Sequence, residues 1–115
     1  MVDLKAELQE GTRSAILAYN MNRAQIVLAA FKEGGPEAVA RLEDEFAALC
    51  NADFALERAA LNANHRQYRH LLSEAAANCD LLHQSLIAVD STADILDFMG
   101  KTVTILGRLL VMLTA

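Results

Sequence analysis

The chain has 115 residues, of which 54% are hydrophobic and 22% charged, and its formal net charge at pH 7 is −5. This length is enough to bury a core, so we expect residues 1–115 to form a single helical domain. The acidic balance argues against nucleic-acid binding, which requires a basic surface.

The two cysteines, Cys50 and Cys79, are too few for a disulfide framework and lack the spacing of a metal site. Both lie on apolar helix faces, which predicts free buried thiols in a reducing compartment, that is, a cytoplasmic protein. The N-terminal residues have no apolar segment of the signal-peptide type. Few aromatic residues and much alanine and leucine are typical of a helical bundle.

The first predicted helix runs from about Asp3, a suitable N-cap, to Glu33. Its large apolar residues recur at spacings of four and three, which is typical of a packing seam. They are Leu17, Met21, Leu28 and Phe31, with the smaller Ala24 between them, and Ile16, Tyr19 and Ile26 widen this seam into a broad face. We therefore expect this face of the helix to pack in the core.

A corner follows at Gly34-Gly35-Pro36. Glycine tolerates the left-handed conformation that ends a helix, and the fixed φ of proline suits the first turn of the next one. The second helix is therefore predicted to begin at Pro36 or Glu37.

No glycine or proline interrupts residues 37–90, so two arrangements fit the second helix. If it is continuous to about Val89 it spans ~80 Å, and the fold is an antiparallel bundle of three long helices that needs a partner to complete its core. If it is broken near Asn62–Arg66, where asparagines lower helix propensity, the chain forms an up-and-down four-helix bundle. The absence of a breaker favours the continuous helix. The need to bury apolar area in a monomer favours the break.

The third helix is expected from about Thr92 to Leu113, after the cap-forming residues Asp90-Ser91-Thr92 and the acidic Asp94. Its polar side chains form one narrow stripe, and the remainder is so apolar that the helix must pack on more than one side. Gly100 and Gly107 would permit a close approach of another helix. Charges at Asp97, Lys101 and Arg108 argue against a membrane span.

The nearest approach to a metal site is Cys79, Asp80 and His83, which lie at helical spacings of three and four. A bundle metal site needs two carboxylate-x-x-histidine pairs and further carboxylates, whereas this chain has one pair. His83 is better explained as a solvated histidine of the helix surface beside the core residue Cys79. His65 is better explained as a buried residue that makes a structural hydrogen bond. We predict no metal, no cofactor and no catalytic residue, and hence no enzyme.

The sequence favours a non-enzymatic interaction protein, adaptor or chaperone-like, that presents an apolar helix face to a protein partner or to itself as a homodimer. The expected binding residues are a basic strip of Arg58, Arg66 and Arg69, and apolar residues of the third helix, Met99, Leu106 and Leu110. Two alternatives stay open. One is a ligand- or metal-binding four-helix bundle, and the other is a membrane-surface protein.

Overall fold

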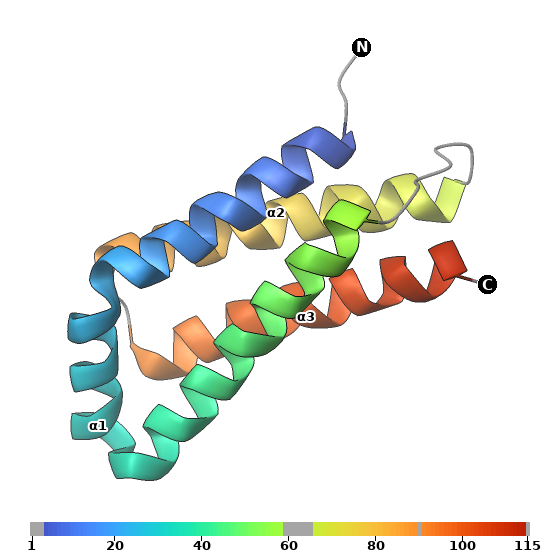
Figure 1. The fold of residues 1–115 in the computed structure, drawn as a ribbon. Coiled ribbons are helices and arrows are strands. Elements are labelled where there is room, and N and C mark those ends of the chain that lie inside the picture. Colours follow the sequence, from blue (N-terminus) through green and yellow to red (C-terminus); the bar gives the residue numbers. More distant parts are fainter. Residues whose placement is uncertain (1–3, 59–65, 90, 115) are drawn as a thin grey trace.

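The computed structural model describes residues 4–58, 66–89 and 91–114, apart from the side chains of residues 4–5, 58, 66–68 and 112–114. These ranges form three helices: α1 (Leu4–Arg58), α2 (Arg66–Ala88) and α3 (Thr92–Thr114). Each helix packs against the other two. The described part of the chain is therefore an all-α bundle with a shared core, as predicted (Figure 1).

α1 consists of two arms that meet at Gly35, and the first arm bends once before it reaches this corner (Figure 1). Gly35 has φ 70° and ψ −159°, a backbone conformation that is essentially restricted to glycine. A Cβ atom placed on Gly35 would have no neighbour within 4 Å, so the backbone angles alone require glycine there. Pro36 then occupies the first turn of the second arm. The predicted corner at Gly34-Gly35-Pro36 is confirmed.

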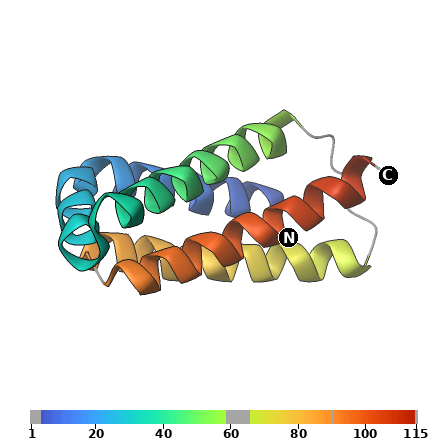
Figure 2. The same ribbon diagram turned by 90° about the horizontal axis from the view of Figure 1, so that it is seen from below.

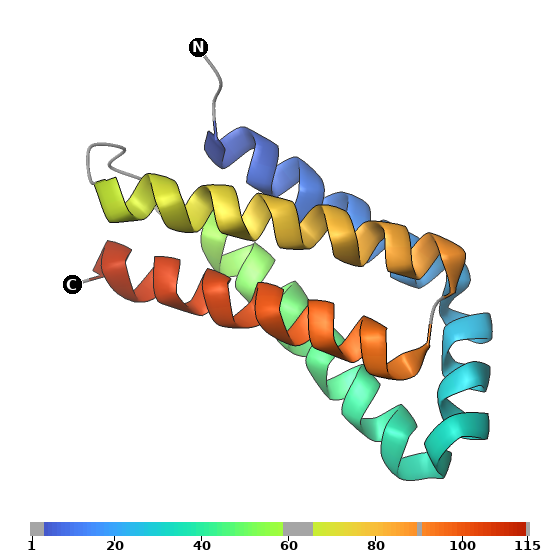
Figure 3. The ribbon, with the colours of Figure 1, turned by 180° about the vertical axis from the view of Figure 1, so that it is seen from behind.

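The bundle has two layers, with the two arms of α1 packed over the hairpin of α2 and α3 (Figures 2 and 3). Its principal extents are 46 × 26 × 19 Å, which leaves no room for a continuous helix from residue 37 to residue 89. The continuous arrangement is therefore wrong: α1 ends at Arg58, α2 begins at Arg66, and the two helices pack against each other. The predicted break at Asn62–Arg66 lies mostly outside the described residues. Antiparallel packing buries apolar faces that an extended helix would leave in water.

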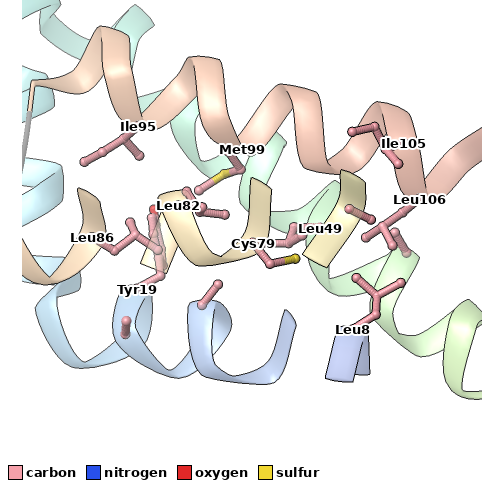
Figure 4. Close-up of a cluster of buried hydrophobic side chains, with 14 of the residues drawn as sticks. Leu8, Tyr19, Leu49, Cys79, Leu82, Leu86, Ile95, Met99, Ile105 and Leu106 are labelled. Carbon is pink, nitrogen blue, oxygen red and sulfur yellow. The ribbon is translucent and has the colours of Figure 1, made fainter. Parts of the chain in front are cut away.

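Side chains from all three helices form one hydrophobic core (Figure 4). Fully buried residues include Leu8 and Tyr19 of α1, Leu82 of α2, and Met99 and Leu106 of α3. Each such side chain contributes roughly 1.5–3 kcal/mol by leaving water. The core lies between the two layers and extends along the bundle.

Polar contacts fix how the helices begin and end. The Ser91 hydroxyl accepts a hydrogen bond from the Asp94 amide at 3.2 Å, so the predicted cap of α3 is confirmed at this contact. The Thr92 amide donates to the Glu33 carboxylate at 3.1 Å, which ties the α3 N-terminus to α1. At the other end of the same connection, the side-chain Nδ2 of Asn22 donates a hydrogen bond to the backbone carbonyl of Leu86 in α2 at 3.0 Å.

α3 buries one broad face and exposes the predicted polar stripe. The residues of this stripe, Asp94, Asp97, Lys101, Thr104 and Arg108, are all exposed. A Cβ atom on Gly100 or on Gly107 would have no neighbour within 4 Å. The close helix approach expected at these two glycines is therefore not made by any described part of this chain.

Candidate functional site

The predicted basic strip lies where α1 ends and α2 begins. Arg58 is the last residue of α1 and Arg66 the first of α2, and both side chains lie outside the described residues. Arg69 is exposed on α2 beside exposed His70, whose Nε2 lies 4.0 Å from Oε2 of Glu74. A docking role for these arginines stays a prediction.

The three apolar residues of α3 that were expected to bind a partner are wholly or partly buried. Met99 and Leu106 have no exposed surface, because they fill the core against α1 and α2 (Figure 4). Leu110 is half-buried. The excess of apolar positions on α3 is thus largely used inside the chain, and Met99 and Leu106 are removed from the candidate surface.

The three metal candidates line one pocket, together with Glu7 and Glu10, but they are not arranged to hold a metal ion. Cys79 is fully buried, Asp80 is exposed and His83 is half-buried. The Cys79 sulfur lies 3.5 Å from Oγ1 of Thr12, which belongs to the core of α1. Within the described residues, no three His, Cys, Asp or Glu side chains are arranged to hold a metal ion. His65 lies outside the described residues.

The most informative surface lies on the first arm of α1, where the expected packing seam faces outward. We call Leu17, Met21, Ala24, Leu28 and Phe31 the outer seam. Its four large side chains are 59%, 76%, 54% and 55% exposed, in chain order. The prediction that this face packs in the core is therefore wrong for the outer seam, whereas Tyr19 and Ile26, which the prediction also included, are buried. The core face of the same arm is smaller and more polar, and it consists of Leu8, Thr12, Ala15, Ala18, Tyr19, Ile26 and Ala30.

Close packing explains why the smaller face is buried. A Cβ atom on Gly11 would lie 3.4 Å from the Cβ of Cys79, so α1 and α2 approach closely at this level. Ala15 of α1 and Ala75 of α2 are also fully buried. Small residues allow the helix axes to come near each other, whereas leucine and phenylalanine at the same positions would hold them apart.

The outer seam continues into a groove at the corner of α1. This corner groove lies between the two arms, encloses about 560 Å³, and is lined almost entirely by apolar atoms. Its lining comprises Ala24, Val27, Leu28 and Phe31 from the first arm and Pro36, Val39 and Ala40 from the second. We call the outer seam and the corner groove together the α1 apolar surface. Sequence reasoning missed this surface, although two apolar stripes on opposite faces of the first arm were the available signal.

A hydrogen-bonded cluster holds the two arms at this corner. Glu43 of the second arm accepts from the Tyr19 hydroxyl at 2.8 Å and from Arg23 Nη2 at 2.7 Å and Nε at 3.1 Å. The Tyr19 ring stacks on Phe46, with centroids 3.8 Å apart. Burial first, and the Glu43 carboxylate second, raise the pKa of Tyr19 well above its ordinary value. Tyr19 therefore stays neutral and serves as a hydrogen-bond donor.

The second arm carries two further groups whose pKa is raised, Cys50 and Asp53. Oδ1 of Asp53 is buried without a hydrogen-bond partner, and burial raises the pKa of this carboxyl group. Burial, and then the charge of Asp53, raise the pKa of the Cys50 thiol. A thiol with a raised pKa is a poor nucleophile at neutral pH, so this pair does not resemble an activated catalytic cysteine.

No helix in the described ranges has the length and apolar character needed to cross a membrane. No protein-family model matches the chain, and no curated protein or solved structure matches it either. The α1 apolar surface is therefore the feature of the described residues that bears on function.

Proposed function

We propose that this chain is a non-enzymatic helical interaction protein, an adaptor or chaperone-like module, that binds a protein helix on its α1 apolar surface. One observation carries the proposal. Four large apolar side chains of the outer seam, Leu17, Met21, Leu28 and Phe31, are each more than half exposed on one helix face. Contiguous apolar surface of this kind is costly in water and marks interaction sites.

The shape of the surface fits a helix. The outer seam repeats at spacings of four and three, the pattern with which one helix packs its side chains between those of another. The adjoining corner groove offers a depression beside Phe31 and Pro36 that a large apolar side chain of the bound helix would enter. Helix-in-groove binding uses anchors at these same spacings.

A protein partner is favoured over a lipid surface because the α1 apolar surface has little positive charge around it. Helices that lie on membranes usually carry rows of lysine and arginine beside the apolar face, since cell membranes are anionic. Here Arg23 is already paired with Glu43, and the whole chain is acidic. Lys32 and Arg13 are the remaining cations next to the outer seam, and Arg13 pairs with Glu57 at 3.1 Å.

Photo-crosslinking in cells tests this proposal. Benzoylphenylalanine replaces the exposed Met21 in one variant and the exposed Gln84 of α2 in a matched control. We expect a protein adduct from position 21 that Leu28→Glu abolishes and Ile87→Glu leaves intact, because Leu28 and Ile87 are similarly exposed, at 54% and 58%, on different helices. No adduct above the Gln84 control, or flotation with anionic liposomes that Leu28→Glu abolishes, would overturn the proposal.

A further inference from the structure

We infer that a second copy of this chain binds the α1 apolar surface, with the two first arms packed antiparallel about a twofold axis. This inference rests on the proposed function and names its partner. In a twofold interface the same surface patch faces itself, so the patch must be complementary to its own reverse. The segment from Met21 to Phe31 has this property.

The order of side-chain sizes along the outer seam supplies the complementarity. When two copies run antiparallel with this segment in register, Ala24 of each copy faces Leu28 of the other. The small alanine leaves the space that the leucine fills, which brings the two helices close together. The end positions pair in the same way, with Met21 against Phe31, and a thioether sulfur packs favourably against an aromatic ring. A parallel pairing would instead place Ala24 against Ala24 and leave a gap.

The charges permit the same arrangement although the chain as a whole is acidic. The outer seam from Leu17 to Phe31 has no charged member, so no charge would be buried at the centre of the contact. Lys32 is the charged residue beside the seam at its end, and in the antiparallel register it lies near Asn20 of the second copy. Two copies with a net charge of −5 therefore meet through a neutral strip.

The exposed area is consistent with a dimer of modest stability. Met21, Leu28 and Phe31 are 76%, 54% and 55% exposed, and the corner groove adds Val27, Pro36, Val39 and Ala40. From ordinary side-chain areas, these residues expose at most on the order of 600 Å² per copy. Two copies would then bury no more than about 1,200 Å², which is the lower limit of the range for stable interfaces, about 1,200–2,000 Å². We expect a dimer that dissociates on dilution.

The first experiment measures the mass of the purified full chain by analytical ultracentrifugation from about 5 to 500 µM, a range that brackets micromolar dissociation constants. We expect a monomer–dimer equilibrium for the natural sequence and for Ile87→Glu, and a monomer for Leu28→Glu. Circular dichroism checks that Leu28→Glu folds, and Met21→Glu serves as a second variant at the more exposed position. A dimer that Leu28→Glu and Met21→Glu leave unchanged would overturn the inference, because the interface would then lie elsewhere.

The second experiment tests the antiparallel register. Met21→Cys and Phe31→Cys are made separately in a Cys50→Ser background, which leaves only the fully buried Cys79. A short bismaleimide should link Met21→Cys to Phe31→Cys when the two variants are mixed. It should link neither variant to itself, because ten residues of helix separate the two copies of either cysteine by about 15 Å. Links within each single variant would show a parallel pair and overturn the inference.

Different results would disprove the second-copy inference and the proposed function. If the purified chain stays monomeric over the whole range while position 21 crosslinks to a different protein in cells, the second-copy inference is wrong and the proposed function stands. If position 21 gives no adduct at all and the chain is monomeric, both are wrong.

Discussion

The Tyr19 hydroxyl donates a hydrogen bond of 2.8 Å to Oε2 of Glu43, and this contact joins the two arms of α1 across 24 residues of sequence. Arg23 binds the other carboxylate oxygen of Glu43, Oε1. One acidic side chain of the second arm thus holds two residues of the first arm. This cluster ties together the two arms on either side of the corner that carries the α1 apolar surface.

Replacing Tyr19 by phenylalanine should destabilise the fold by about 1–2 kcal/mol, because the substitution removes a hydrogen bond to a charged acceptor and keeps the aromatic ring. The stacking on Phe46 is retained, so the difference in unfolding free energy measures the contribution of the hydroxyl group. Urea unfolding followed by circular dichroism measures the effect. A loss below about 0.3 kcal/mol would show that water replaces the Glu43 contact at little cost.

The raised pKa of Tyr19 predicts a loss of stability at alkaline pH. Below the ordinary tyrosine value of 10.0, the side chain is neutral in both the folded and the unfolded chain. Above it, Tyr19 ionises in the unfolded chain and stays neutral in the folded one. The unfolded state then binds fewer protons, and stability falls by up to about 1.4 kcal/mol per pH unit.

The matching control is Tyr19→Phe, which has no hydroxyl group to ionise at this position. Unfolding free energies of both proteins are compared between about pH 8 and 11, on either side of the ordinary tyrosine pKa. We expect the advantage of the natural sequence to shrink above pH 10. If the unfolding free energies of the two proteins stay parallel across this range, the pKa of Tyr19 is not raised in the folded protein.

Asp53→Asn should stabilise the protein at neutral pH. Burial raises the pKa of Asp53 above its ordinary 3.8, so the folded state favours the protonated carboxyl, and this contribution to stability is lost as the pH rises through the raised pKa. The asparagine side chain stays neutral throughout. The gain at pH 7 should not exceed about 1 kcal/mol, because the side chain is only partly buried and Arg13 partly offsets the penalty.

Thermal unfolding of the natural sequence and of Asp53→Asn at pH 3 and pH 7 checks this prediction, since the two proteins should converge at pH 3, below the ordinary pKa of 3.8. The difference between the two proteins cancels the titration of the other carboxylates. A neutral-pH loss of stability in Asp53→Asn would mean that the Asp53 charge is favourable in the fold.

Two glycine substitutions should have opposite effects. Gly35→Ala should destabilise by about 1–3 kcal/mol, because alanine is strained at a positive φ. Gly100→Ala should stabilise by about 0.5–1 kcal/mol, because Gly100 lies inside a helix. A Cβ at either position has no neighbour within 4 Å, so steric clashes cannot explain a difference. Chemical denaturation of both variants measures it, and effects of equal sign would refute the backbone explanation.

Local features of the fold were predictable from short stretches of sequence. The corner needs only Gly35 for its positive φ and Pro36 for its first turn, and the α3 cap needs only Ser91 in front of Asp94. The polar stripe of α3, exemplified by Asp97 and Lys101, follows from helical periodicity alone. Each of these features depends on a few neighbouring residues.

The face of the first arm that packs inward could not be predicted in the same way. This arm has two apolar stripes on opposite sides, and the larger residues, Leu28 and Phe31 among them, made the outer seam the expected core. The structure buries the stripe that contains Thr12 and Ala15 instead. Apolar area alone would favour burying the outer seam, because its side chains are larger. The stripe that packs against α2 is instead the one whose small residues allow close contact.

By itself, therefore, the sequence determined an all-α chain, its corner at Gly35 and the polar stripe of α3, because backbone preferences and periodicity are local. Only the tertiary structure decided that the helices on either side of residues 59–65 pack against each other, and that the outer seam stays exposed. Both outcomes depend on how well distant surfaces fit together, and shape complementarity between distant segments is not encoded in the pattern of any one helix.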